Sequence, residues 1–100
     1  MTPEKKVKNK VVAVLKAYEA YYFFPATGGY GVSGVPDVVG CYKGKFFAIE
    51  CKAGVNKPTA LQDRNMQKIK DNGGLAIVVN EENQEAVENL LRGIDETKGG

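Results

Sequence analysis

Two segments rich in β-forming residues flank the dipeptide Lys43-Gly44, and this pattern restricts the possible folds of the chain most strongly. The segments cover residues 35–42 and 45–53. A short loop that ends in glycine between two such segments is typical of a β-hairpin. With a two-residue loop, Tyr42 pairs with Lys45, so the numbers of any two paired residues sum to 87.

That register brings two acidic residues together. Asp37 lies directly opposite Glu50, and facing β-carbons are about 4.5–5.5 Å apart. Because side chains alternate between the two faces of a strand, Glu50 and Lys52 share one face and Cys51 points to the other. A four-residue loop keeps this pairing, whereas a three-residue loop shifts it. We therefore expect two carboxylates and one ammonium group at the same surface.

The remaining chain alternates between helical and β patterns. Thr2 and Pro3 begin the first helical stripe, and a crossover through the middle helix leads to the fourth strand. In chain order we expect a helix over 3–20, a strand over 21–24, a glycine-rich loop over 27–34, the hairpin, a helix from Thr59 to Gly73-Gly74, a strand over 75–79, and a helix from Asn80 to Gly93. This order predicts one α/β domain over residues 1–96, with a mixed sheet of about four strands flanked by helices, and a frayed tail over 97–100.

The residue types that are missing narrow the possible chemistry. The 100 residues include no histidine, which excludes histidine general bases and histidine-bound zinc. Ser33 is the only serine, so a Ser–His–acid triad is impossible, and two cysteines are too few for a four-ligand zinc site. No segment approaches the roughly 20 apolar residues of a membrane span, and no signal-peptide pattern is present. We expect a cytoplasmic protein in which Cys41 and Cys51 are free thiols.

Charge is distributed unevenly along the chain. Residues 1–79 carry 12 Lys/Arg and 6 Asp/Glu, a net charge of +6, whereas residues 80–100 carry 2 and 6, a net charge of −4. The excess of positive charge over residues 1–79 favours a polyanionic partner. A solvated surface with an acidic last helix explains the same numbers equally well.

The segment Gly29–Gly34 matches the dinucleotide-binding pattern G-x-G-x-x-G. That pattern binds a pyrophosphate only where a helix begins at its last glycine. Here Val35-Pro36-Asp37 follows, and proline with β-branched residues begins a strand instead. We therefore expect no nucleotide cofactor.

Two facing carboxylates repel each other unless something compensates. A divalent cation such as Mg²⁺ or Mn²⁺ prefers such oxygen ligands, and Lys52 is placed to stabilise negative charge on a phosphate. Metal-assisted phosphodiester hydrolysis uses all three groups. The alternative is that Lys52 forms salt bridges with Asp37 and Glu50 on a solvated face.

The sequence Gly34-Val35-Pro36-Asp37, followed after twelve residues by Glu50-Cys51-Lys52, resembles the PD-(D/E)XK nuclease signature. More narrowly, the chain resembles stand-alone VRR-NUC domains, the virus-type replication–repair nucleases of phages and bacteria. The lead-in from Ser33, the Gly44 turn, Gln62 and the Gly73-Gly74 pair before a strand also agree with that family. The resemblance covers nearly the whole chain and implies a restriction-endonuclease-like core.

This resemblance implies roles for individual residues. Asp37, Glu50 and the backbone carbonyl of Cys51 would be metal ligands, and Lys52 the catalytic lysine. An acid on the first helix would also be functional, and Glu4 matches it better than its rival Glu19. A first-turn acid is, however, also favoured by the helix dipole alone.

Gln62 is a further candidate, as a polar side chain that leans into the active site. Thr59-Ala60-Leu61-Gln62 is equally a capping box, which explains the glutamine without any function. Lys57, Arg64, Lys68 and Lys70, with the amino-terminal lysines, are candidates for phosphate contacts, although each alone also fits a solubilising role. Tyr30 would contact DNA or pack against the sheet.

The family resemblance further implies a homodimer that cuts branched DNA, four-way (Holliday) junctions above all, in the bacterial cytoplasm or that of a phage host. Two symmetric cuts need two active sites, and one chain offers one. The alternatives are a nucleic-acid-binding module without catalysis and a scaffold domain without a DNA partner.

Overall fold

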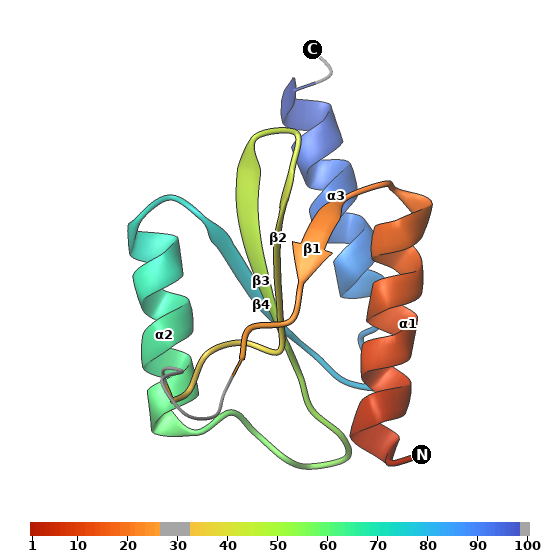
Figure 1. The fold of residues 1–100 in the computed structure, drawn as a ribbon, viewed down its shortest axis with the longest axis vertical. Helices are drawn as coiled ribbons and strands as arrows, with labels where there is room; N and C mark the ends of the chain where they lie inside the picture. Colours follow the sequence, from red (N-terminus) through yellow and green to blue (C-terminus); the bar gives the residue numbers. More distant parts are fainter. Residues whose placement is uncertain (27–32, 99–100) are drawn as a thin grey trace.

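The computed structural model describes residues 1–26 and 33–98 and has seven elements (Figure 1). They are α1 (Pro3–Ala17), β1 (Tyr21–Phe23), β2 (Val38–Tyr42), β3 (Lys45–Cys51), α2 (Ala60–Asp71), β4 (Leu75–Val79) and α3 (Glu85–Lys98). The predicted α/β class and the order of its elements are confirmed. Within the described residues, no helix is long and apolar enough to cross a membrane.

The four strands form one mixed sheet in the order β1-β2-β3-β4. Strands β1, β2 and β3 pair antiparallel, and β4 joins β3 in parallel after the crossover through α2. The hairpin has the predicted register, from Tyr42↔Lys45 to Val38↔Ile49. Lys43 and Gly44 have positive φ angles of 49° and 85°, as the loop of a tight hairpin requires.

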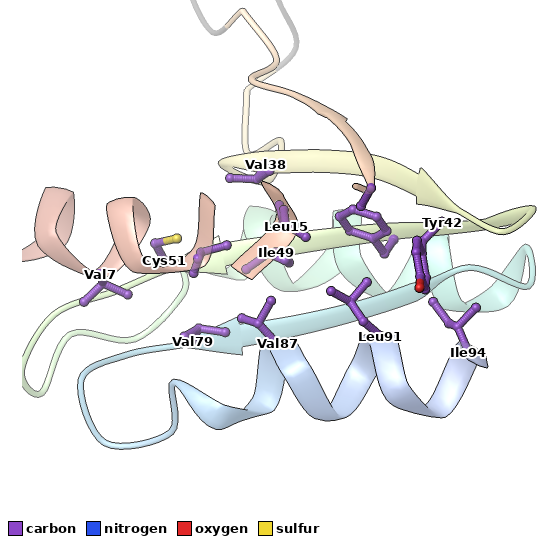
Figure 2. Close-up of a cluster of buried hydrophobic side chains, with 13 residues drawn as sticks. Val7, Leu15, Val38, Tyr42, Ile49, Cys51, Val79, Val87, Leu91 and Ile94 are labelled. Carbon is purple, nitrogen blue, oxygen red and sulfur yellow. The ribbon is translucent and has the colours of Figure 1, made fainter. Parts of the chain in front are cut away.

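Helices cover the sheet on both faces (Figure 1). Helices α1 and α3 pack on one face over the larger core, and Figure 2 shows these side chains between the helices and the sheet; the labelled ones are Val7, Leu15, Val38, Tyr42, Ile49, Cys51, Val79, Val87, Leu91 and Ile94. Helix α2 packs on the other face, where its Met66 and Ile69 meet Val39, Ala48 and Ala76. We call this second face the α2 face.

Two helices begin at the residues that the sequence indicates. Thr2 is the N-cap of α1 and accepts a hydrogen bond from the Lys5 backbone N–H. Thr59 is the N-cap of α2 and forms the expected capping box with Gln62. After α2, Gly73 takes a φ of 91°, which favours glycine.

Several element boundaries differ from the prediction. Helix α1 ends at Ala17 rather than at residue 20, because Glu19 has a φ of 58° and leaves the helix. Strand β2 begins at Val38 rather than at residue 35, since Pro36 has no backbone N–H to donate to a sheet. Strand β1 ends at Phe23, and β3 ends at Cys51 rather than at residue 53.

The predicted limits of the last helix are wrong at both ends. Asn80 does not begin α3: its backbone N–H donates to the Asn83 side chain, and its own side chain accepts from Glu82 N–H, so a turn comes first. At the other end, α3 continues through Gly93 to Lys98, so Thr97 belongs to a helix and not to a frayed tail. Residues 99–100, and the loop residues 27–32 with Tyr30 and most of the glycine-rich pattern, lie outside the described residues.

Candidate functional site

The two predicted acids lie at the open end of the β2–β3 hairpin, opposite the Lys43-Gly44 turn. Asp37 occupies the bend directly before β2, and Glu50 is the last but one residue of β3. Glu50 follows the buried Ala48 by two residues, which places its side chain on the α2 face. Its contact with Gln62 of α2 agrees with this placement.

Asp37 accepts a backbone hydrogen bond where the pairing of β2 with β3 ends. Its Oδ2 accepts a hydrogen bond of 2.8 Å from the backbone N–H of Cys51, just past the last β2–β3 pair. In an extended strand, the N–H and C=O groups of one residue point toward the same neighbour. The Cys51 carbonyl is therefore directed to the side of the sheet edge on which Asp37 lies.

Glu50 is buried, with only 2% of its surface exposed. Its Oε2 accepts hydrogen bonds from Gln62 Nε2 at 2.9 Å and pairs with Lys52 Nζ at 3.2 Å. Its Oε1 is buried and has no hydrogen-bond partner among the described residues. This burial excludes the alternative in which Glu50 belongs to a solvated charged face.

The surroundings of Glu50 favour its neutral form. The pKa of its carboxyl is raised from 4.5 to about 7, first by burial and then by the charge of Asp37. The hydrogen bond and charge of Lys52 act in the opposite direction. Lys52 alone therefore does not compensate for the buried carboxylate.

Cys51 contributes its backbone, not its thiol, to this end of the hairpin. The thiol points into the larger core on the other face (Figure 2). Burial, and secondly the charge of Asp37, raises the pKa of the thiol to about 12. Both cysteines are free, as expected: Cys41 is exposed, and Cys51 is buried.

Gln62 contacts both the start of α2 and the side chain of Glu50. Its Oε1 accepts from the Thr59 backbone N–H at 2.9 Å, and its own N–H donates to Thr59 Oγ1 at 3.1 Å. Its Nε2 at the same time donates to Glu50 Oε2. One amide thus joins the start of α2 to the buried carboxylate.

Glu4 lies in the first turn of α1, a helix that packs on the opposite face from α2. It is exposed, and its negative charge makes the smallest of the named contributions to the raised pKa of Glu50. No hydrogen bond or ion pair joins Glu4 to the other candidate residues in the part of the chain that the structure describes. Its rival Glu19 is exposed in the turn after the far end of α1.

The candidate phosphate contacts all lie on the surface. Lys57 precedes α2, and Arg64, Lys68 and Lys70 lie on it; all four are exposed.

One contact near the site is not predicted by the sequence. The carboxylate oxygens of Glu81 accept from the Gly54 backbone N–H at 3.0 and 3.1 Å, which anchors the loop after Lys52 to the loop after β4. Hydrogen bonds from backbone N–H groups, that of Gly54 among them, lower the pKa of Glu81. The two residues are 27 positions apart in the sequence, so no local pattern indicates the contact.

A divalent cation such as Mg²⁺ requires several oxygen atoms as ligands. In the described residues there is no group of three or more Asp, Glu, His or Cys side chains that could hold a metal ion. Mg²⁺, however, is commonly bound through one or two carboxylates, with water and substrate phosphate completing its ligands. Asp37, the partnerless Glu50 Oε1 and the Cys51 carbonyl fit that kind of site.

A scan against models of protein families and a search of curated proteins gave no match to this chain. Its function must therefore be inferred from the arrangement of Asp37, Glu50, Lys52 and Gln62.

Proposed function

We propose that this protein is a metal-dependent endodeoxyribonuclease with a restriction-endonuclease-like core, similar to the VRR-NUC domains of the PD-(D/E)XK superfamily. The observation that carries the proposal is the buried Glu50, whose Oε1 has no hydrogen-bond partner in the described residues beside a second acid and a lysine. An unpaired buried carboxylate oxygen is costly, and proteins keep such groups at functional sites.

Asp37, Glu50 and the Cys51 carbonyl would hold the cation, Mg²⁺ or Mn²⁺. When bound, it supplies Lewis acidity to a phosphodiester oxygen and lowers the pKa of a water molecule. A cation held there would also relieve the repulsion between the two acids and favour the ionised form of Glu50.

Lys52 and Gln62 have separate tasks in this proposal. The Lys52 ammonium group lies 3.2 Å from Glu50 Oε2, with 14% of its side chain exposed, so it reaches both the acid and an incoming phosphate. There it stabilises the negative charge that develops on the phosphate. Gln62 holds Glu50 Oε2 by a hydrogen bond and leaves Oε1 for the cation. Glu4 adds negative charge at the same end of the molecule.

We propose branched DNA, above all the four-way junction, as the substrate, because the chain resembles stand-alone VRR-NUC domains. The exposed cations of α2, such as Arg64 and Lys68, would contact phosphates without reading sequence. A homodimer would supply the two active sites that symmetric cutting of a junction requires.

The test is cleavage of a labelled four-way junction and of a linear duplex, in Mg²⁺ and in EDTA. We expect Mg²⁺-dependent cutting that Asp37→Ala and Glu50→Gln abolish. Glu96→Ala removes an exposed acid of α3 and should cut like the wild type. Binding of the junction without cutting would contradict the proposal and favour a binding module, and neither binding nor cutting would favour a scaffold.

A further inference from the structure

Three aromatic side chains are exposed on the α2 face. Tyr21, Phe23 and Phe46 have 68%, 48% and 44% of their surface exposed. Pairing places Tyr21 opposite Cys41 and Cys41 opposite Phe46, so these residues form one row across three strands. Phe23 lies opposite Val39, whose side chain contributes to the core of the α2 face. We call Tyr21, Phe23 and Phe46 the aromatic strip.

Helix α2 covers only part of its face. Its contacts concentrate on β4, and Met66 and Ile69 pack on the small side chains Ala48 and Ala76. The strand order places β1 at the edge of the sheet opposite to β4. The aromatic side chains of β1 and of the start of β3 thus remain exposed on this face.

The aromatic strip leads directly to the candidate acids. Asp37 precedes Val39, the strand partner of Phe23, by two residues. The row of Tyr21 and Phe46 lies four residues along the strands from the row of Asp37 and Glu50, or about 13 Å. A strand of DNA on the strip would therefore extend into the acidic site.

Positive charge borders the strip. Phe46 lines a shallow groove against α2; the other lining residues are Asn65, Lys68, Ile69, Asn72 and Gly74. Lys68 is exposed and forms no ion pair in the described part of the chain. Lys52 lies at the acidic end. Aromatic surface beside lysine and asparagine matches the bases and phosphates of nucleic acid better than it matches an apolar protein face.

We propose that the aromatic strip binds an unpaired DNA strand by stacking its bases. This inference rests on the proposed nuclease function and adds a substrate feature to it: unpaired nucleotides next to the phosphodiester that is cut. Bases inside a duplex have their faces covered by their neighbours, so only unpaired bases can stack on the strip. The Tyr21 and Phe23 rings are 6.2 Å apart, well above the spacing of about 3.4 Å between stacked bases, so each ring holds a separate base.

The first test measures binding in EDTA, where cleavage does not occur. The probe is a fluorescent twelve-residue oligothymidylate, compared with an abasic strand of the same length. Tyr21→Ala and Phe23→Ala should each weaken oligothymidylate binding about tenfold and leave abasic-strand binding unchanged. Tyr21→Phe keeps the ring and should bind like the wild type. Equal weakening for both strands would overturn the proposal.

A second test uses the unmodified protein. Cys41 lies between Tyr21 and Phe46 and is exposed, whereas Cys51 is buried and its thiol has a raised pKa. Oligothymidylate should slow alkylation of Cys41 by iodoacetamide at least fivefold, and the abasic strand should not. An unchanged alkylation rate would contradict the proposal even if an alanine variant failed to fold.

A third test distinguishes DNA from a second copy of the chain as the molecule that binds the aromatic strip. Light scattering should give the same molar mass for wild type, Tyr21→Ala and Phe23→Ala. A change from dimer to monomer would identify the strip as a subunit interface and overturn the proposal. Mg²⁺-dependent cutting without oligothymidylate binding would refute the strip alone, whereas oligothymidylate binding without cutting would refute only the nuclease.

Discussion

The two ends of the β2–β3 hairpin both carry charged groups, but their charges are balanced differently. At the turn, Asp95 of α3 accepts hydrogen bonds from Tyr42 Oη at 2.8 Å and from Lys43 Nζ at 2.6 Å. These two bonds, that of Lys43 first, hold the pKa of Asp95 below its usual value. The acid at this end is stabilised in its charged form and remains partly in contact with water.

At the open end, Glu50 has a lysine partner as well, yet its pKa is raised to about 7. The difference lies in water and in a second acid: Glu50 is buried, and Asp37 lies beside it. One lysine therefore stabilises the charged form of the single acid at the turn. At the open end, one lysine does not offset the burial of Glu50 and the charge of Asp37. The pKa of the acid is thus lowered at the turn and raised at the open end.

The largest effect should distinguish the lysines of the two ends. Lys52→Ala should reduce cleavage of a four-way junction about 10²–10³-fold, because it removes the charge that stabilises the phosphate. Lys43→Ala removes an equal charge at the turn and should cut like the wild type. Single-turnover assays in Mg²⁺ measure both, and equal losses in the two variants would end the functional distinction between the hairpin ends.

The next effect concerns stability against pH. The pKa of Glu50 is higher in the folded chain, so the folded state binds the proton more tightly between pH 4.5 and about 7. The unfolding free energy should therefore fall as pH rises through this window, by up to about 3 kcal/mol, and then level off. Urea unfolding at several pH values measures the fall in EDTA.

Glu50→Gln should remove that decline, whereas Glu96→Gln should keep it. The acid at the turn should change stability in the opposite direction. Because the pKa of Asp95 is lowered in the folded chain, Asp95 stabilises the fold above its unfolded pKa, and this stabilisation is lost as the pH falls through its folded pKa. A wild-type stability that is flat between pH 4.5 and 7 would show that Glu50 is not held neutral.

Mg²⁺ should stabilise the folded chain through the open end of the hairpin alone. Mg²⁺ at ten times its Kd should stabilise the wild type by about 1.4 kcal/mol, because it binds only the folded site. Asp37→Asn should reduce the rise in Tm, and Asp95→Asn should leave it intact. Differential scanning fluorimetry with and without Mg²⁺ gives these values, and an unaltered response in Asp37→Asn would locate the ion elsewhere.

The smallest effect is expected at the turn. Tyr42→Phe removes the hydroxyl that donates to Asp95 and should lower Tm by a few degrees without changing cleavage. Thermal unfolding followed by circular dichroism provides the measurement. A loss of cleavage in Tyr42→Phe would show that the turn affects the site at the open end, and would contradict the distinction between the two ends of the hairpin.

The sequence predicted those features that depend on near neighbours. The Lys43-Gly44 loop determined the hairpin register, and Thr59 with Gln62 determined the start of α2. The last helix was less accurate, because Asn80 hydrogen-bonds within a turn and Gly93 lies on an exposed part of α3 where it does not interrupt the helix. Neither outcome follows from residue type alone.

Contacts between distant segments could not be predicted in the same way. The residues that pair with Asp95 are 52 and 53 positions away, and those joined by the Gly54–Glu81 contact are 27 apart. The burial of Glu50 also depends on how α2 packs, so the sequence left a solvated face open as an alternative. The dual role of Gln62 appears only once α2 lies against β3.

The order of these segments in the chain has a consequence for folding. Asp37 and Glu50 belong to a hairpin with a two-residue loop, whereas the Gln62 contact to Glu50 comes from a helix synthesised later. Short-range contacts form faster than long-range ones. On the ribosome, the hairpin is synthesised before α2, so its two acids stay in water until α2 packs over Glu50. We therefore expect the repulsion between the two acids to become costly only when α2 docks.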